Sequence, residues 1–452
     1  MFNDLIMELP QEAAYILRVL NEGGFEAYIV GGCVRDSIQK KIPKDWDIST
    51  NAKPHEVKSL FGRTIDTGIK HGTVTVLIDN RSFEVTTYRI DGDYADSRRP
   101  LSVRYTSLLM DDLSRRDFTM NAIAFHPNAG LVDPFNGIGD IEQRVIRTVG
   151  SPERRFREDA LRMIRAVRFS AQLDFAITKD AIQSIRNNSA LIRNISHERI
   201  RDELTKILES ENPSKFILLR DTNLLQYILP EFEICFHTPQ NNAYHIYNTA
   251  VHTLNSIAHV ACDGILRWTM LLHDIGKPLA KTTDIEGIDH FFGHPEKSVQ
   301  LSEIILKRLK FDNKTIKKIC RLIRYHDMNI KPDPVSVRKA VITVGDDIFA
   351  DLVEIQKADK KAQNPKFLEE RLACLSEIEK NYFDVKEKKQ CLSLKDLAVD
   401  GHDLMDIGLV EGKKIKTMLI RLLNIVVENP ELNNKDELLK SAGRIKQASD
   451  KV

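Results

Sequence analysis

The sequence predicts an α+β protein in which a small domain with a β-sheet comes first and helical domains follow. The chain has 452 residues, which is too long for one ordinary core and indicates two to four domains. Patterns typical of strands fall early in the chain, at residues 28–30, 73–78 and 82–87. Later stretches, such as 195–208 and 413–427, instead have the apolar spacing of amphipathic helices.

The composition is that of a soluble globular protein, with 42% apolar and 29% charged residues. The 66 basic and 65 acidic residues nearly cancel, so a surface that binds nucleic acid has to be local. Six scattered cysteines without a Cys-x-x-Cys pair predict reduced thiols in the cytosol. No apolar stretch is long enough to span a bilayer, and the first ten residues lack an export signal. We therefore expect a cytoplasmic protein that does not contact membranes.

The first elements form a candidate phosphate site. Residues 11–22 have the spacing of an amphipathic helix, and a short apolar strand is expected at 28–30. Gly31 and Gly32 follow this strand, where they allow unusual backbone angles and the close approach of a ligand. A helix over 34–39 would then direct its free N–H groups toward a phosphate.

Two carboxylates follow, Asp45 and Asp47, separated by one residue. In a strand both side chains would point to the same face, and their oxygens would suit one or two Mg²⁺ ions. An isolated Asp-x-Asp is more often a solvated strand end. A phosphate cradle followed by paired carboxylates, in this order, indicates nucleotidyl transfer.

The string Gly31-Gly32-Cys33-Val34-Arg35-Asp36, taken with Asp45-Trp46-Asp47, resembles a known family. It is similar to the head of the class II tRNA nucleotidyltransferases, the CCA-adding enzymes, and of their bacterial poly(A) polymerase relatives. The resemblance implies a nucleotidyltransferase head with a polymerase-beta-like fold and a mixed sheet. It also implies that Asp45 and Asp47 are catalytic and hold Mg²⁺, and that Gly32 and Arg35 bind the nucleotide.

Residues 73–78 and 82–87 are expected to form a hairpin around 79–81. Glu84 falls inside its second strand, where a buried unpaired charge would be costly. It could be a core carboxylate satisfied by a neighbour. We favour a third active-site acid, either a metal neighbour or the base for an incoming hydroxyl. The family resemblance supports this position.

Residues 90–103 are rich in paired charges and predict a mobile surface loop. The loop resembles the flexible element with which CCA-adding enzymes add the terminal A, and which CC-only relatives lack. This resemblance favours complete CCA addition.

Arg115 and Arg116 precede an apolar run that we expect to be helical. Alone they could be a solvated helix start, although the guanidinium fork suits triphosphate oxygens. The string through Ala124 matches a family motif, which implies that Arg116 binds the triphosphate. Asp117 and Asn121 would then shape that site.

Residues 158–169 predict a helix on which Asp159, Arg162, Arg165 and Arg168 recur at steps of three. Such a row is more commonly a salt-bridged solvated face. The alternative is a protein template, because a carboxylate beside a guanidinium can hydrogen-bond the pairing edges of cytosine or adenine. The resemblance implies that Asp159 and Arg162 select the base and that Arg165 and Arg168 contact the nucleotide.

A second set of candidate ligands lies in the middle of the chain. In order it comprises His252, His273, Asp274, His294, His326 and Asp359. Any one of these histidines is more simply a hydrogen-bonded residue, but imidazole and carboxylate together suit divalent metals.

The ordered set resembles the HD-domain metal phosphohydrolases. The resemblance implies a first divalent metal (Mg, Mn, Ni or Co) on His252, His273, Asp274 and Asp359. His294 and His326 could hold a second. A bound hydroxide would attack a phosphate ester, giving a possible phosphatase or 2′,3′-cyclic phosphodiesterase side activity.

The expected domains are a nucleotidyltransferase head at 1–150, a helical neck at 151–239 for base recognition, an HD domain at 240–365 and a tRNA-binding helical tail at 366–452. Ser196 is a plausible cap of the helix at 195–208.

The function expected from these features is addition of C, C and A to the 3′ end of tRNA from CTP and ATP. Two alternatives are a poly(A) polymerase and an enzyme adding only A or only CC. A third, in a different class, is a metal phosphohydrolase whose head only binds nucleotide or RNA. The oligomeric state is left open.

Overall fold

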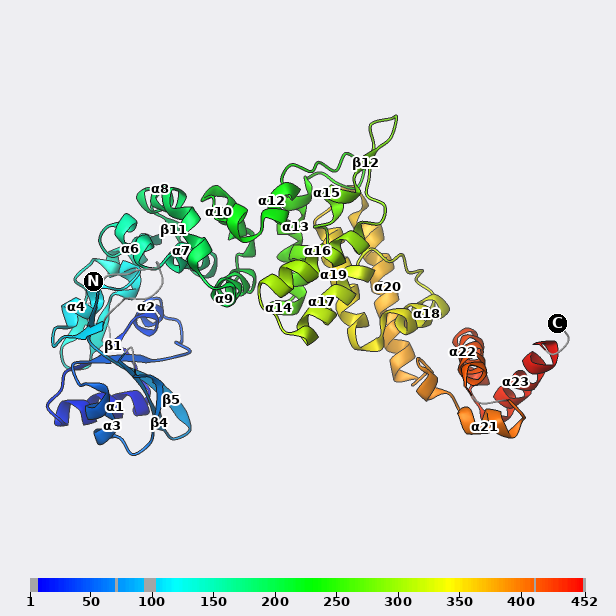
Figure 1. Ribbon diagram of the computed structural model, residues 1–452, viewed down its shortest axis with the longest axis horizontal. Helices are drawn as coiled ribbons and strands as arrows, with labels where there is room; N and C mark the ends of the chain where they lie inside the picture. The colour runs from blue at the N-terminus through cyan, green and yellow to red at the C-terminus, as the bar shows by residue number, and fades with distance from the viewer. Residues whose placement is uncertain (1–6, 70–71, 93–102, 410–411, 450–452) are drawn as a thin grey trace. The chain divides into compact units, whose positions relative to one another are not determined.

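The computed structural model describes residues 7–69, 72–92, 103–409 and 412–449 (Figure 1). The chain divides into two compact units, Met1–Glu233 and Ile234–Val452. The first contains a seven-stranded sheet, and the second is built mainly of helices. The predicted α+β class, with the sheet first and helices after it, is confirmed. The finer division into four domains remains a prediction.

The sheet has the strand order β3-β4-β5-β2-β1-β8-β9. Its β2–β5 pair is parallel and its other pairs are antiparallel, so the sheet is mixed as expected. The seven strands are β1 (Ala27–Val30), β2 (Asp47–Thr50), β3 (Thr64–Gly68), β4 (Thr73–Ile78), β5 (Arg81–Thr87), β8 (Ala124–His126) and β9 (Gly130–Val132). Shorter pairs are β6 (Arg89–Asp91) with β7 (Val103–Tyr105), and β10 (Val145–Ile146) with β11 (Ala176–Ile177).

Helix α1 has the bounds that the sequence predicts, Gln11–Glu22, because Ile16, Leu17 and Leu20 form one buried face. It contacts α3 and the sheet (Figure 1). The other helices around the sheet are α2 (Gly32–Ile38), α3 (Pro54–Leu60), α4 (Leu109–Ser114) and α5 (Gly137–Glu142). The sequence predicts a helix after Arg116, and this prediction is wrong. The segment forms a 3₁₀ turn, η2 (Thr119–Asn121), and then strand β8.

The predicted hairpin is confirmed as β4 and β5. Its turn consists of Asp79 and Asn80, both with positive φ, a conformation that suits a two-residue hairpin connection. The side chains of β5 alternate, so Phe83 and Val85 are buried while Glu84 is exposed. The expectation that Glu84 lies in apolar surroundings is therefore wrong, because the charge belongs to the polar face of the strand.

The expected helix over 158–169 is interrupted. Helix α6 ends at Glu158, Asp159 has an extended backbone (φ −139°), and α7 begins at Leu161. The Asp159 carboxylate accepts a hydrogen bond of 3.0 Å from the Leu161 N–H, and such local bonding competes with continuous helix. Ser196 precedes α9 as predicted, but its side chain makes no capping bond.

A series of helices follows the sheet and begins with α6. They are α6 (Pro152–Glu158), α7 (Leu161–Leu173), α8 (Lys179–Asn188), η3 (Ser189–Asn194), α9 (His197–Leu208), η4 (Pro213–Phe216), α10 (Ile217–Asp221), α11 (Leu225–Ile228) and α12 (Pro230–Cys235).

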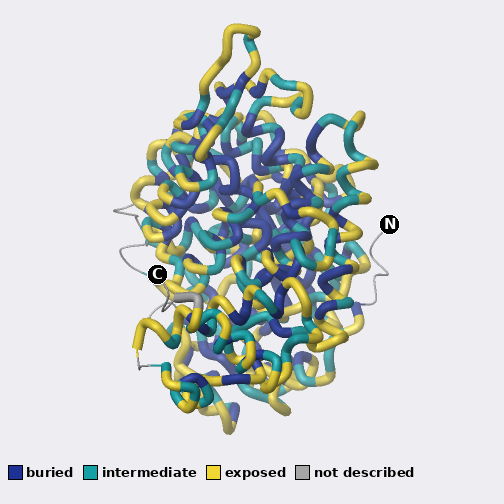
Figure 2. The backbone as a smooth tube through the Cα atoms, turned by 90° about the vertical axis from the view of Figure 1, so that its right-hand side faces the viewer, coloured by how far each residue is buried: buried dark blue, intermediate teal, exposed yellow. Residues whose placement is uncertain are grey.

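The second unit consists mainly of helices, with one small hairpin formed by β12 and β13. The elements are α13 (Thr249–Ile257), α14 (Gly264–Leu272), α15 (Lys277–Ala280), β12 (Thr282–Thr283), β13 (Asp289–His290), α16 (His294–Arg308), α17 (Asn313–Tyr325), α18 (Pro334–Val344), α19 (Asp346–Lys361), η5 (Pro365–Phe367), α20 (Leu368–Glu387), η6 (Leu394–Asp396), α21 (Gly401–Asp406), α22 (Lys413–Glu428), η7 (Pro430–Leu432) and α23 (Lys435–Ser449). Each of the longer helices contains buried residues, whereas the connection between β12 and β13 is mostly exposed (Figure 2).

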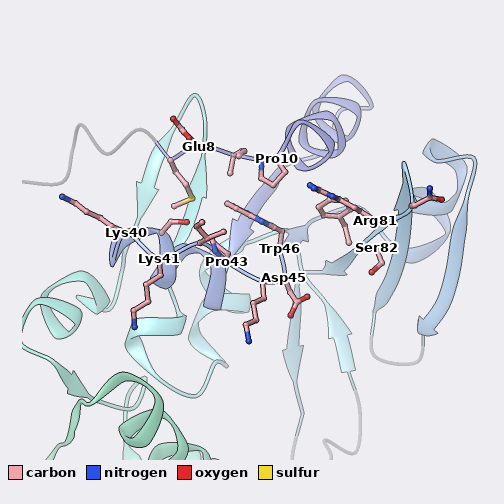
Figure 3. A pocket seen from close by; sticks show the side chains of 16 residues that line it. Glu8, Pro10, Lys40, Lys41, Pro43, Asp45, Trp46, Arg81 and Ser82 are labelled. Atoms are coloured by element: carbon pink, nitrogen blue, oxygen red, sulfur yellow. The ribbon is translucent and has the colours of Figure 1, made fainter. Parts of the chain in front are cut away.

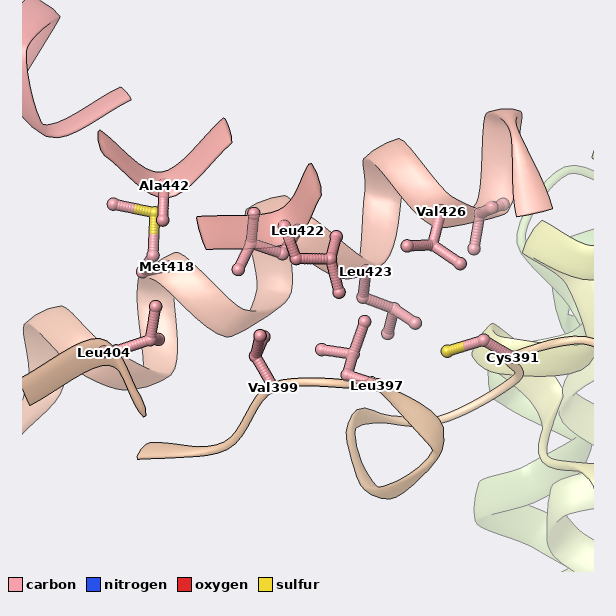
Figure 4. Close-up of a cluster of buried hydrophobic side chains, with 11 residues drawn as sticks. Cys391, Leu397, Val399, Leu404, Met418, Leu422, Leu423, Val426 and Ala442 are labelled. Carbon is pink, nitrogen blue, oxygen red and sulfur yellow. The ribbon is translucent and has the colours of Figure 1, made fainter. Parts of the chain in front are cut away.

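The C-terminal helices α21, α22 and α23 enclose a small apolar core of their own. Leu404, Met418, Leu422 and Ala442 meet within it, together with residues of the preceding segment (Figure 4). Among the described residues, no helix is both long and apolar enough to cross a membrane.

Candidate active site

Two acids meet in the middle of the head sheet. Asp47 begins β2, and its register partner on the parallel strand β5 is Glu84. Asp45 lies two residues before β2, outside the strand, so the expectation of two acids within one strand is wrong. The reason is that β2 pairs with β1 only from Asp47 onward, opposite Val30, where the partner strand ends.

Gly31 opens the space beside these acids. Its φ of +81° favours glycine, and a Cβ atom there would lie 3.0 Å from Arg116 Nη1 and 3.8 Å from Asp47 Oδ2. Glycine therefore lets the guanidinium and the carboxylate approach the backbone at the start of α2. Arg35, on α2, donates hydrogen bonds to Asn121 Oδ1 (2.8 Å) and Asp36 Oδ1 (2.7 Å), which fixes it in the wall of the site.

The acids repel one another. Desolvation in the cleft raises the pKa of Asp47 to about 6, Glu84 and Asp45 act in the same direction, and Arg116 opposes them. In the described part of the chain, the carboxylate oxygens of the three acids do not all lie within 4.8 Å of one another. Carboxylate oxygens whose charges are mutually unfavourable fit a hard divalent cation, which would relieve the repulsion.

Arginines line the same cleft from α7 and from the segment between α4 and η2. Arg116 is half-buried, pairs with Asp112 at 3.1 Å and donates to Ser49 Oγ at 3.2 Å. Arg165 contacts Asp117 at 2.6 Å. Burial opposes ionisation of Asp117, but Arg165 and Arg162 hold the pKa of its carboxyl below the usual range.

The predicted base-reading pair is held by partners that the sequence did not indicate. Asp159 pairs with Arg199 of α9 at 2.9 Å. Arg162 pairs with Glu158 at 2.7 Å and donates to the Arg115 carbonyl at 2.9 Å. The carboxylate and the guanidinium are thus positioned separately, each by its own ion pair.

Arg168 lies deeper in the same wall. Its guanidinium stacks 4.0 Å from the Phe169 ring centre and pairs with Glu203 at 2.9 Å. Desolvation and the neighbouring Arg165 lower its pKa to about 10, against the opposing charge of Glu203. Nothing local distinguishes Glu203 or Arg199 in the sequence, because both come from a helix more than 30 residues downstream.

One cleft of about 530 Å³ gathers nearly all the residues predicted for the head. Those that line it are Gly32, Arg35, Asp47, Glu84, Arg116, Asp117, Asn121, Asp159, Arg162, Arg165 and Arg168. Asp45 is the exception, because it lines a neighbouring cleft with Trp46 (Figure 3). The first cleft combines acids that suit a metal with a row of cations that suits a triphosphate.

The second unit contains two converging groups of possible metal ligands. His252, His273, Asp274 and Asp359 form one, and Asp274, His294 and His326 form the other, with ligand atoms within 4.8 Å of one another in each group. All six residues are buried. These are the groups that the sequence predicted, with the addition that Asp274 belongs to both.

The four imidazoles share one orientation. In each ring Nδ1 faces a backbone carbonyl, which can only accept, so Nδ1 carries a proton and Nε2 faces the cluster, where it offers a lone pair in the neutral ring. Nε2 of His252 lies 2.9 Å from Asp359 Oδ1. Burial opposes protonation of His273, but Asp274 and Asp359 raise its pKa to about 10, so a metal bound there would displace a proton. The Nε2 atoms of His294 and His326 lie 3.1 Å apart. Two lone pairs at this separation repel each other unless a cation lies near them.

The carboxylates of the cluster also fit a metal. Neither oxygen of Asp274 makes a hydrogen bond of good geometry, nor does Nε2 of His273, although all three are buried. Burial opposes ionisation of Asp274, but His273 and Lys277 hold its pKa well below the usual range. Lys277 Nζ lies 2.6 Å from one Asp274 oxygen, and Asp359 accepts from Gln363 and Lys360, so these cations and donors hold the carboxylates in place. Buried imidazole nitrogens and carboxylate oxygens that converge in this way form a donor set for a divalent metal.

Comparison with known proteins defines the class. The head matches the family model of the poly A polymerase head domain over residues 27–147. Residues 174–235 match the probable RNA and SrmB-binding site of polymerase A, and residues 291–442 match a putative domain 2 of tRNA nucleotidyltransferase. These matches place the chain in the class defined by the poly A polymerase and tRNA nucleotidyltransferase family models.

Curated relatives match about half of the chain. The CCA-adding enzyme of Lactobacillus johnsonii is 48% identical over 227 residues, or 49% of this chain and 57% of that protein. The CCA-adding enzyme of Geobacillus thermodenitrificans is 49% identical over 219 residues, or 48% and 54%. The chain thus spans little more than half the length of the curated relatives it matches.

Solved structures extend the likeness to nearly the whole chain. The Bacillus stearothermophilus CCA-adding enzyme in complex with CTP is 30% identical, with a TM-score of 0.75, and the match covers 98% of each chain. The chain therefore belongs to the family of CCA-adding enzymes. The Thermotoga maritima CCA-adding enzyme complexed with tRNA shares the fold at 18% identity, with a TM-score of 0.59 over 97% of this chain and 96% of that one.

Proposed function

We propose that this protein adds C, C and A to the 3′ end of tRNA, taking CTP and ATP and releasing pyrophosphate. The observation that carries the proposal is the single cleft in which Asp47 and Glu84 face Arg116 and the Asp159–Arg162 pair. A solved structure that matches nearly the whole chain is a CCA-adding enzyme in complex with CTP, which supports the choice of nucleotide. The dispersed cysteines fit work in the cytoplasm.

In this proposal the head residues divide the work between the triphosphate and the base. Asp45 and Asp47 would hold Mg²⁺, which when bound supplies charge neutralisation for the triphosphate. Arg116 contacts the triphosphate oxygens beside Gly31, and Asp117 with Asn121 holds the surrounding arginines in place. Glu84 is placed to take the proton of the attacking 3′ hydroxyl.

Base selection is assigned to Asp159 and to the arginines of α7, which line the same cleft as the acids. Asp159 offers acceptor oxygens and Arg162 donor N–H groups, so together they can pair with the edge of cytosine or adenine. Arg165 and Arg168 line the same wall and contact the nucleotide. Because no nucleic-acid strand is needed to present these groups, the addition requires no template.

Incubation of tRNA lacking its CCA end with CTP and ATP tests the proposal. Asp47→Ala should abolish extension, because the metal and the triphosphate lose their shared anchor, while Asp79→Ala in the β4–β5 turn should extend normally. Near-normal extension by Asp47→Ala would remove the assignment.

Poly(A) polymerase and partial A-only or CC-only enzymes are the alternatives within the class. CTP alone should give two added residues, and both nucleotides should give three. Long A tails on unrelated RNA would favour the polymerase instead. The loop expected to support terminal A addition falls mainly at residues 93–102, outside the described residues.

We further propose a hydrolase activity at the His–Asp cluster, because its imidazole lone pairs converge on buried carboxylates. The metal would be Mg, Mn, Ni or Co, and it would supply a bound hydroxide for attack on a phosphate ester such as a 2′,3′-cyclic phosphate. Turnover should survive Asp47→Ala and disappear in Asp274→Ala. Loss in both variants would argue that the activity belongs to the head.

A further inference from the structure

A second cleft neighbours the nucleotide cleft in the chain and is lined by the third acid, Asp45. It has a volume of about 1110 Å³ and lies beside the loop that joins α2 to β2. Asp45 lines this cleft, whereas Asp47 and Glu84 line the first. Asp45 and Asp47, which are two positions apart in the sequence, therefore line two different clefts.

The charge of the second cleft is mainly positive. Its ionisable lining residues are Glu8, Lys40, Lys41, Lys44, Asp45 and Arg81. Arg81 pairs with Glu12 at 3.4 Å. Within the described residues, Lys40, Lys41 and Lys44 are exposed and make no ion pair, so their charge is available to an anionic ligand.

Apolar side chains stand among these lysines. Ile42 is 94% exposed. Trp46, which lies between Asp45 and Asp47 in the sequence, is half-buried. Figure 3 shows Trp46 and Asp45 in the middle of the cleft, with Lys40 and Lys41 on one side and Arg81 and Ser82 on the other. A positively charged groove with an aromatic side chain is the combination that binds single-stranded nucleic acid, because bases stack while cations follow the backbone.

We propose that this cleft holds the single-stranded 3′ end of the RNA that is extended. Lys41 and Lys44 contact its phosphates, and a terminal base packs against Trp46. This inference rests on the proposed nucleotide addition, in which the attacking and leaving oxygens must lie roughly in line. A nucleotide in the first cleft leaves the second cleft, where Asp45 lies, for the RNA strand, whose 3′ hydroxyl then reaches Asp47 and Glu84 from that side.

Tryptophan fluorescence tests the placement without turnover. The chain has two tryptophans, and Trp268 is 1% exposed in the other unit, so quenching reports on Trp46. Without nucleotide, an acceptor-stem RNA hairpin with a four-residue 3′ overhang should quench the emission, and the same hairpin with a blunt end should not. Equal quenching by both, or by neither, would overturn the inference.

Charge reversal tests the role of the lysines. Lys41→Glu and Lys44→Glu should each weaken the quenching titration at least fivefold and lower its salt slope by roughly 0.7 per lost phosphate contact. The KM for tRNA should rise similarly, while the KM for CTP stays within twofold. Lys179→Glu, an exposed lysine that lines neither cleft, is the matched control.

Two outcomes separate this inference from the function on which it rests. If the wild-type protein completes CCA ends but the lysine variants keep their affinity for the overhang, only the placement of RNA in this cleft is wrong. If the wild-type protein adds no nucleotide, the proposed function itself fails. Normal thermal melting of the variants excludes misfolding as the cause of weaker binding.

Discussion

Asp47 carries a charge that its surroundings disfavour. Its carboxylate lies beside Glu84 in the register of the sheet, and its pKa is raised to about 6. A raised carboxyl pKa means that the folded state binds a proton more tightly than the unfolded state does. The ionised carboxylate of Asp47 therefore lowers the free energy of unfolding above about pH 6. This destabilisation disappears as the pH falls from about 6 toward the usual carboxyl pKa, because the native carboxyl becomes protonated. Such a cost is typical of residues retained for function.

Asp47→Asn should consequently raise the melting temperature of the metal-free protein at pH 8, where the native carboxylate is charged. The gain should shrink as the pH is lowered from 6 to 4, because native Asp47 then becomes protonated. Differential scanning calorimetry in EDTA measures both values. Asp79→Asn, the same change in the exposed turn of the hairpin, should show no such trend, and a lower melting temperature for Asp47→Asn at pH 8 would contradict the electrostatic argument.

At the scale of elements, the break between α6 and α7 shapes the base-reading wall. Continuous helix would place Asp159 and Arg162 one turn apart on one surface. The break turns Asp159 toward Arg199 of α9, while Arg162 pairs with Glu158 at the end of α6. The positions of the Asp159 carboxylate and the Arg162 guanidinium thus depend on α6, α7 and α9, and α9 acts through the ion pair between Arg199 and Asp159.

Arg199→Ala should release Asp159 and weaken discrimination between bases. We expect misincorporation of UTP relative to CTP to rise about tenfold, equivalent to about 1.4 kcal/mol of lost discrimination. Single-nucleotide incorporation with each triphosphate measures the ratio. Arg201→Ala, two residues along the same helix, is the control. An unchanged ratio in Arg199→Ala would mean that Asp159 needs no support from α9.

The sequence predicts elements well where the signal is local. The apolar face of α1 and the β4–β5 hairpin follow from periodicity and turn residues, and both are confirmed. The sequence does not predict the break at Asp159, because the residues around it favour a helix and the hydrogen bond from the Leu161 N–H to the Asp159 carboxylate is not evident from their pattern. Arg199 and Glu203 were missed because only tertiary contacts bring α9 to the cleft. The His–Asp ligands were found because residue type and order, rather than distance along the chain, define such a set.

At the scale of the whole molecule, the two candidate sites belong to different units. The nucleotide cleft lies in Met1–Glu233 and the His–Asp cluster in Ile234–Val452. The cluster draws its ligands from α13, α16 and α19 and from the residues that follow α14 and α17. A metal bound there would link these helices, and binding to the folded state alone stabilises that state.

Mn²⁺ should therefore protect the second unit selectively. At a free concentration 100 times its dissociation constant, the stabilisation should be about 2.7 kcal/mol. Hydrogen-exchange mass spectrometry should show slower exchange in α13, α14 and α19. Asp274→Ala should lose this protection, whereas Glu286→Ala, in the exposed connection between β12 and β13, should retain it. Equal protection in Asp274→Ala would place the metal elsewhere.

A crystal structure with CTP and Mg²⁺ tests the central claim most directly. The account predicts the triphosphate beside Gly31, Arg116 and Asp47, with the cytosine edge hydrogen-bonded to Asp159 and Arg162. A triphosphate bound away from Asp47, or a cytosine that turns from both of these side chains, would contradict it.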